Sequence, residues 1–331
     1  MITFACVNQK MSKTMTILKN TGNKDTRSGF GDGLMIAAER NKNVVALCAD
    51  LTGSLKMDKF AQSYPERFFQ TGIAEANMMG VAAGLTIGGK IPFAGTFAEF
   101  ASGRVYDQVR QSIAYSNKNV KIAASHAGLT LGEDGATHQT MEDIALMKAL
   151  PHMVVINPAD YNQTKAATIA VAEYDGPVYL RFGRPKVPNF TPEDMPFEIG
   201  KAWKIKEGKD VTIFATGHLL WKALEAEEIL RQKGIDVELI NIHTIKPLDE
   251  KTIVESAAKT KAVVTAEEHL MNGGLGDSVA QVLARKLPTP MEYVAVDDKF
   301  GESGTEEELL EKYGINTRHI VEAVEKVLKR K

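Results

Sequence analysis

Cysteine is scarce in this 331-residue chain, which has two, Cys6 and Cys48. Two thiols build neither a disulfide framework nor a four-thiolate zinc site, so we expect a reducing, cytoplasmic environment. Apolar runs of the roughly 18 residues that span a bilayer are also missing. Residues 1–22 carry lysines and no apolar block, which is typical of a loosely held lead-in rather than a signal peptide.

An excess of charge of either sign is missing too. Lys and Arg number 40 and Asp and Glu number 42, for a formal charge of −2, which argues against a nucleic-acid or acidic-membrane partner. Hydrophobic residues make up 44% and charged residues 25%, as in ordinary globular proteins. At about 150 residues per domain, the length predicts two domains.

Short Val- and Ile-rich runs alternate with segments of helical period in the first half of the chain. We predict strands over 44–49, 91–95, 120–125, 153–157 and 178–182. Helices are predicted between them over 75–87, 141–150 and 162–174. This alternation predicts a parallel sheet covered by helices on both faces, in a domain spanning 23–188.

The pattern lapses around three prolines, and we predict a linker over 189–200. The alternation then restarts with strands over 211–215, 237–242, 262–266 and 291–296. Helices are predicted over 219–233 and 275–286. The second domain, 201–331, is therefore also predicted to be α/β, which makes two parallel-sheet α/β domains in all.

Two segments that contain glycines and acidic residues are candidate ligand-binding loops. Gly29 to Gly33 opens a predicted helix without a preceding strand, so a structural helix start is favoured over a diphosphate site. The loop over 128–139 follows a predicted strand, and ligands bind at the carboxyl ends of parallel strands. His126, Asp134 and His138 could bind hydroxyls and move protons there, although Glu-Asp-Gly is also ordinary turn chemistry.

Two further candidates are a carboxylate and an aromatic pair. Glu75 begins a predicted helix, where a carboxylate commonly complements the helix dipole. Its apolar neighbours would also desolvate it and let it share a proton with a bound base. Phe97 and Phe100 share a face at a spacing of three, as core residues or as walls for a flat ring.

These pieces together carry a resemblance to a known family. The strings FQTGIAE (69–75) and GEDGATHQ (132–139), with the segment 96–108 between them, resemble the pyrimidine-binding domain of transketolases, and FGESG (300–304) continues the likeness. Transketolases of full length also hold the cofactor diphosphate and metal through an amino-terminal Gly-Asp-Gly and a downstream Asn, which Gly31-Asp32-Gly33 does not match in position. The chain therefore resembles the carboxy-terminal subunit of a split, two-subunit transketolase.

The resemblance implies thiamine diphosphate as cofactor. Glu75 would hydrogen-bond the ring nitrogen of its aminopyrimidine and activate it. Phe97, Phe100 and Tyr106 would line the pyrimidine pocket. A separate amino-terminal subunit would bind the diphosphate and most of the Mg or Ca site, and the two kinds of subunit would assemble into a heterotetramer.

The resemblance also implies substrate-binding residues. Asp134 and His138 would bind the hydroxyls of a donor ketose, and His138 would assist proton transfer. Ala76 stands where split relatives commonly have Gln, which affects fine substrate preference. The implied activity is transfer of a two-carbon ketol unit from a ketose phosphate to an aldose phosphate.

By the same resemblance, we expect a set of polar side chains to bind the phosphate of the acceptor, since phosphate favours charge-assisted hydrogen-bond donors. The matching positions are Arg27, Ser54, His126 and Arg181, with Arg184 an open alternative to Arg181. The sequence does not choose among a pentose phosphate, a branched sugar phosphate and a sulfosugar.

In the second domain we expect structural roles for five polar residues, His218, His243, Glu267, Glu268 and His269. Gly273 to Gly276 resembles a helix start that could take an anion. Three other functions stay open. They are the β-subunit of a 2-oxoacid dehydrogenase decarboxylase, a deoxyxylulose phosphate synthase-like enzyme, and a non-catalytic assembly subunit.

Overall fold

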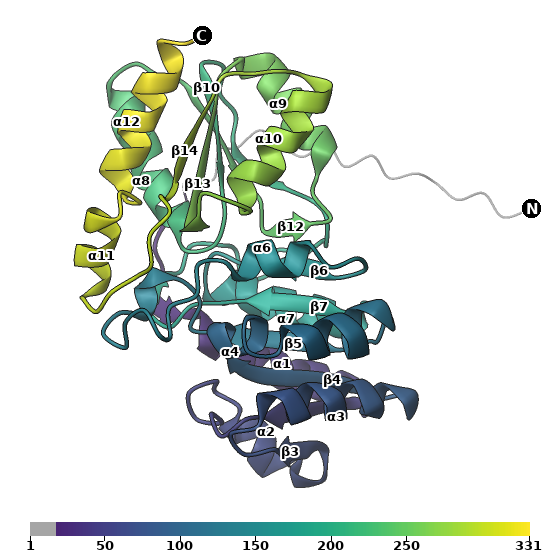
Figure 1. Ribbon diagram of the computed structural model, residues 1–331. Helices are drawn as coiled ribbons and strands as arrows, with labels where there is room; N and C mark the ends of the chain where they lie inside the picture. Colours follow the sequence, from purple (N-terminus) through teal and green to yellow (C-terminus); the bar gives the residue numbers. More distant parts are fainter. Residues whose placement is uncertain (1–17) are drawn as a thin grey trace, which may run out of the picture.

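The computed structural model describes residues 18–331, which form two α/β domains stacked one on the other (Figure 1). The lead-in prediction for residues 1–17 lies outside this range. The larger sheet has seven strands in the order β12-β6-β7-β5-β4-β2-β3. They are β2 (Val44–Cys48), β3 (Phe68–Gln70), β4 (Ile91–Phe97), β5 (Lys121–Ser125), β6 (Val154–Ile156), β7 (Val178–Arg181) and β12 (Thr244–Lys246).

Helices cover both faces of this sheet. They are α1 (Thr26–Arg40), α2 (Asp58–Ser63), α3 (Glu75–Ile87), α4 (Ala98–Ser102), α5 (Tyr106–Gln108), α6 (Asp143–Lys148) and α7 (Tyr161–Glu173), with single turns η1 (Pro65–Arg67) and η3 (Leu129–Leu131) and the wider π-helical η2 (Val109–Tyr115). In β2, Val44 and Ala46 pack into one core, whereas Val45 and Leu47 pack into another. Burial on both faces explains why the strands are uniformly apolar.

Helix α1 lies unusually close to α7. A Cβ atom at Gly29 would sit 2.3 Å from the Tyr161 carbonyl oxygen, and one at Gly33 would sit 2.7 Å from Thr168 Cβ. Only glycine leaves room for this approach. The glycine-rich start of α1 therefore serves helix packing, in agreement with the structural interpretation of its sequence.

The second sheet has five strands in the order β14-β13-β10-β11-β9, all parallel except the edge strand β9. Its strands are β9 (Trp203–Lys206), β10 (Val211–Ala215), β11 (Val237–Asn241), β13 (Val263–Leu270) and β14 (Met291–Val296). Its helices are α8 (Leu219–Gln232), α9 (Glu250–Thr260), α10 (Leu275–Lys286), α11 (Glu306–Lys312) and α12 (Thr317–Leu328). The predicted class, two parallel-sheet α/β domains, is confirmed.

Several short strands are not predicted from the sequence, including the edge strand β9. Strand β12 follows the second domain's β11 but pairs antiparallel with β6 of the first sheet. Strands β1 (Asn23–Asp25) and β8 (Lys186–Pro188) pair with each other just before the predicted linker. One apolar core includes residues of both domains, so the domains form a continuous packed unit. Among residues 18–331, no helix has the length and apolarity to cross a membrane.

Candidate active site

Four rings meet where β4 and β5 end. Phe97 is the last residue of β4, and His126 directly follows β5. Their ring centroids lie 3.8 Å apart, and Phe100 of α4 stacks on Phe97 at 5.9 Å. His138, from the loop over 128–139, meets the Phe100 ring edge-on at 5.4 Å. We call these four residues the aromatic cluster.

Glu75 lies beside this cluster as the first residue of α3. Its carboxylate is only 4% exposed, and its Oε1 accepts a hydrogen bond from Arg104 Nη1 at 3.0 Å. The Arg104 guanidinium also lies 4.0 Å from the centroid of the Phe100 ring. Sequence reasoning gave Arg104 no role, although its spacing of four from Phe100 is the signal that could have found this cation–π contact.

Tyr106 does not join the cluster. Its hydroxyl donates to the Leu146 carbonyl at 3.2 Å, and its ring packs against the core shared by the two domains. The structure thus directs the Tyr106 hydroxyl at α6 and does not bring Tyr106 into contact with the aromatic cluster, so its expected place in a cofactor pocket stays a prediction. These contacts support α5.

Cationic side chains surround His126. Arg27 Nη1 lies 3.5 Å from His126 Nε2 and donates to the Ser54 carbonyl at 3.2 Å, so Ser54 contributes its backbone oxygen to this contact. Burial, and then the charges of Arg27 and Arg184, lower the pKa of His126 to about 3, which keeps the ring neutral. Arg27 Nε forms no hydrogen bond within residues 18–331, but it lies 3.5 Å from Asp25 Oδ1 in an ion pair that offsets part of its charge. Such a group of cations fits an anion.

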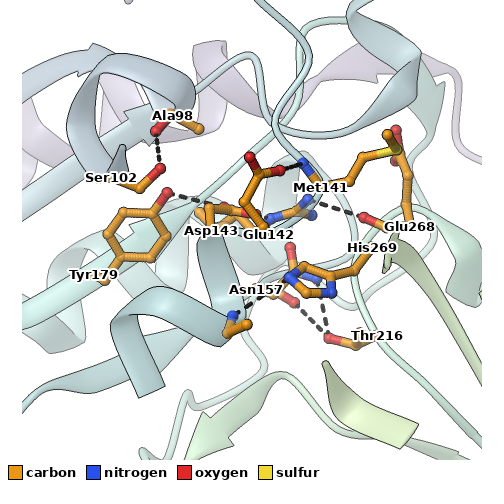
Figure 2. A network of polar contacts seen from close by, with 12 residues as sticks. Ala98, Ser102, Met141, Glu142, Asp143, Asn157, Tyr179, Thr216, Glu268 and His269 are labelled. Atoms are coloured by element: carbon orange, nitrogen blue, oxygen red, sulfur yellow. Dashed lines mark hydrogen bonds and ion pairs between the residues drawn. The ribbon is translucent and has the colours of Figure 1, made fainter. Parts of the chain in front are cut away.

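Arg181 is not part of this group. It is buried, its Nε donates to Asp143 Oδ2 at 2.8 Å, and its Nη2 donates to the Glu268 carbonyl at 2.9 Å. Figure 2 shows Tyr179 and Asp143 directed at one another near Glu268 of the second domain. Two of the Arg181 nitrogens, Nε and Nη2, therefore donate inside the protein, and the expected phosphate contact of Arg181 stays a prediction. Arg184, half-exposed, is close enough to lower the pKa of His126, and its Nη1 donates to the Leu131 carbonyl at 2.7 Å and to Glu133 Oε2 at 3.2 Å.

The loop over 128–139 is anchored by the second domain. Glu268 Oε1 accepts a hydrogen bond from the Thr130 amide at 2.6 Å, and burial raises the pKa of Glu268. Gln139 Nε2 donates to the Leu129 carbonyl and to that of Glu302, at 3.1 and 3.0 Å. These bonds hold half-buried His138 near Phe100, while Asp134 is exposed on the same loop.

The remaining second-domain candidates have structural contacts. Glu267 accepts from the amides of Leu275 and Gly276 at 2.6 and 2.8 Å, so it fills the anion position at the start of α10, and burial raises its pKa to about 7. The His243 ring packs at a tilt against Phe197, with centroids 4.3 Å apart, and His269 Nε2 accepts from the Ala145 amide. These contacts fit the structural roles expected from sequence.

Fold and site together define a two-domain α/β protein with a buried carboxylate, an aromatic cluster and a group of cationic side chains around His126, which directly follows β5. Residues 23–189 match the transketolase pyrimidine-binding domain, and residues 200–320 match the transketolase C-terminal domain. The chain belongs to the transketolase family. Within it, the chain has the layout of a split-enzyme carboxy-terminal subunit.

Three relatives illustrate this layout. A protein named as a transketolase C-terminal section, from Methanocaldococcus jannaschii, is 46% identical over 93% of this chain and 97% of its own length. The 6-deoxy-6-sulfo-D-fructose transketolase subunit SqwH of Clostridium sp. (strain MSTE9) is 44% identical, over 92% and 95%. A split-gene transketolase solved as an inactive beta4 tetramer superposes with a TM-score of 0.87 at 51% identity, covering 92% of this chain and 98% of that one.

Proposed function

We propose that this chain is the carboxy-terminal subunit of a thiamine diphosphate-dependent transketolase. With a separate amino-terminal subunit, it would transfer a two-carbon ketol unit from a ketose phosphate to an aldose phosphate. One observation carries the proposal. Buried Glu75 is joined to Phe100 through Arg104, and Phe100 stacks on Phe97, which stacks in turn on His126. A carboxyl, a ring platform and a group of cations are thus connected by a continuous series of contacts.

The residues present fit the pyrimidine half of the cofactor. An aminopyrimidine ring needs a carboxyl that exchanges a proton with its ring nitrogen and aromatic walls for its faces, and Glu75, Phe97 and Phe100 offer these. When bound, thiamine diphosphate supplies the carbon nucleophile that takes up the ketol unit. No group of three or more His, Cys, Asp or Glu side chains suited to a metal ion occurs within residues 18–331. We assign the metal, Mg or Ca, mainly to the partner.

His138 and Asp134 are the proposed donor-binding residues. His138 Nδ1 lies 2.9 Å from Thr137 Oγ1, which orients the imidazole beside the Phe100 ring. From there, the ring can exchange a proton with a donor hydroxyl as the carbon–carbon bond breaks. Asp134, exposed on the same loop, can accept from a second hydroxyl.

The outer side of α3 supports the proposed assembly. Ile73 and Ile87, at either end of the helix, are each 78% exposed. Between them, Ala76, Gly80 and Gly84 are exposed small residues that let another surface approach closely. Exposed apolar surface of this kind is typical of protein–protein interfaces. It lies beside Glu75, where a second subunit could complete the cofactor site.

Reconstitution tests the proposal. We expect the chain alone to bind thiamine diphosphate weakly and to turn over no ketose, because most of the cofactor's charge would lack a partner. Adding the amino-terminal subunit and Mg²⁺ should give ketol transfer in a coupled assay and a larger complex in analytical ultracentrifugation. Micromolar cofactor affinity of the isolated chain by calorimetry, or an inactive mixed complex, would contradict the proposal.

Substitution of the cations tests the anion site. We expect Arg27→Ala or Arg184→Ala to raise the KM for a phosphorylated acceptor by roughly 10- to 150-fold, the equivalent of one charge-assisted bond. The KM for an uncharged short aldehyde should scarcely change, since it makes no such bond. Arg40→Ala, an exposed arginine at the end of α1, is the control. Equal effects on the KM of both acceptors would show that Arg27 or Arg184 stabilises the fold or contacts the partner subunit, and does not bind the phosphate.

The same cations suit a sulfonate as well as a phosphate, because both are compact anions with several acceptor oxygens. The relative named for 6-deoxy-6-sulfo-D-fructose makes sulfosugars a substrate class to include in these assays. Parallel measurements with phosphorylated and sulfonated ketoses would identify the donor.

A further inference from the structure

Arg104 joins the two side chains that the proposed function assigns to the pyrimidine ring. Its Nη1 donates to Glu75 Oε1 at 3.0 Å, and its guanidinium carbon lies 4.0 Å from the Phe100 ring centroid. We propose that Arg104 is a placeholder, which occupies the pyrimidine position in the free subunit and leaves it when the cofactor ring enters. This inference rests on the proposed function and adds a competing state to the same site.

The chemical match is close. A guanidinium is flat, carries N–H donors in its plane and stacks on aromatic faces. An aminopyrimidine is also flat, presents nitrogen to a carboxyl and stacks on an aromatic face. Phe97 already stacks on Phe100 at 5.9 Å. A further flat group can therefore lie over Phe100 only after the guanidinium moves.

In the free subunit, Arg104 stabilises the buried carboxylate of Glu75. The Glu75 carboxylate is almost fully buried, and a buried charge without a partner is costly. Arg104 supplies that partner, and the positive end of the α3 dipole adds to its effect. The hydrogen bond between Arg104 and Glu75 can therefore form in the folded chain before any cofactor is present.

Arg104 can also leave without disturbing the core. It stands on the segment that connects α4 and α5, and its side chain is 49% exposed. A second carboxylate, Glu99, is near enough for the charge of Arg104 to lower its pKa, although burial raises that pKa more. A swing from Glu75 toward Glu99 would exchange one anionic partner for another.

Release of Arg104 also suits the chemistry of Glu75. The Arg104 guanidinium uses Oε1 of the Glu75 carboxyl, whereas the ring nitrogen must share a proton with the same group. With Arg104 in place, the Glu75 carboxyl is hydrogen-bonded to the guanidinium, as in the free subunit. With Arg104 displaced, it is free to exchange a proton with the ring.

Cofactor binding is the first test. The experiment compares wild type with Arg104→Met, which keeps the side-chain length without the charge. Each is assembled with the amino-terminal subunit and titrated with thiamine diphosphate and Mg²⁺, and intrinsic fluorescence or heat reports binding. Removing a competitor that fills the site most of the time should tighten binding by roughly three- to tenfold. Arg110→Met, an exposed arginine of η2, is the matched control and should leave affinity unchanged.

Two results would overturn the inference. Weaker binding by Arg104→Met would show that Arg104 holds the ring or orients Glu75 in the loaded site, and unchanged binding would show that it does not compete. If wild type itself binds no thiamine diphosphate, the proposed function fails. If wild type binds the cofactor and Arg104→Met binds it no more tightly, only the placeholder role fails.

Stability of the free chain gives a readout without cofactor. We expect Arg104→Met to lower the melting temperature by roughly 1 to 3 °C, because Glu75 loses its partner. In the Glu75→Gln background the same substitution should have less than half that effect, since no buried charge remains to be paired. Equal effects in both backgrounds would mean that Arg104 does not serve Glu75, and the placeholder role would be wrong.

Discussion

Glu75→Gln is expected to leave the chain folded and to lower ketol transfer by the reconstituted enzyme by about 10²- to 10⁴-fold, the usual scale for lost acid–base help. The amide oxygen still accepts the hydrogen bond from Arg104, so the start of α3 should keep its geometry. What the amide lacks is a proton that it can share with a ring nitrogen. The loss should therefore appear in kcat, with assembly unchanged.

Initial rates with saturating donor and acceptor measure this effect. Glu39→Gln, an exposed carboxylate on α1, makes the same chemical change away from the site and should keep wild-type rates. Circular dichroism and ultracentrifugation confirm that both variants fold and assemble. Near wild-type turnover by Glu75→Gln would show that another group activates the cofactor.

Arg181→Met is expected to destabilise the free chain by about 3 to 5 kcal/mol, the usual cost of removing one partner from a buried ion pair. Asp143 is fully buried, its Oδ2 accepts from Arg181 and Tyr179, and its Oδ1 has no hydrogen-bond partner among the described residues. Without Arg181, its charge is left inside the protein. The Glu268 carbonyl loses a donor in the same step.

Urea unfolding of the free chain measures this loss. Adding Asp143→Asn to Arg181→Met should recover much of the stability, because the neutral amide can still accept from the Tyr179 hydroxyl. Arg231→Met, in an exposed pair with Glu228, should have little effect. If Arg181→Met instead leaves stability intact and raises the KM for a phosphorylated acceptor, Arg181 contacts phosphate and does not stabilise the fold through Asp143.

Apolar pattern was enough to predict the regular elements around the site. Helix α3 (Glu75–Ile87), strand β10 (Val211–Ala215) and helix α10 (Leu275–Lys286) have the predicted bounds. Parallel strands buried on both faces must be apolar throughout, and the helices that cover them must repeat apolar residues every three to four positions. These local requirements are written in the sequence itself.

The sequence also determined which residue types meet at the carboxyl ends of the strands. Phe97 ends β4, and His126 follows β5, its neighbour in the sheet, so their proximity follows from strand order. The transketolase resemblance rests on motifs in these same segments, and the family assignment agrees with it. The roles of Glu75, His138 and the cations stay proposals.

Tertiary structure alone decided which polar groups are used inside the protein. Arg181 and Arg184 are three residues apart and chemically identical, yet one is paired with buried Asp143 and the other is half-exposed and paired with exposed Glu133. Strand β12 is three residues long and carries no periodic signal, so only its pairing with β6 reveals it. The partner of an arginine, like the partner of a short strand, depends on burial and contacts between distant segments, and neither is encoded in local spacing.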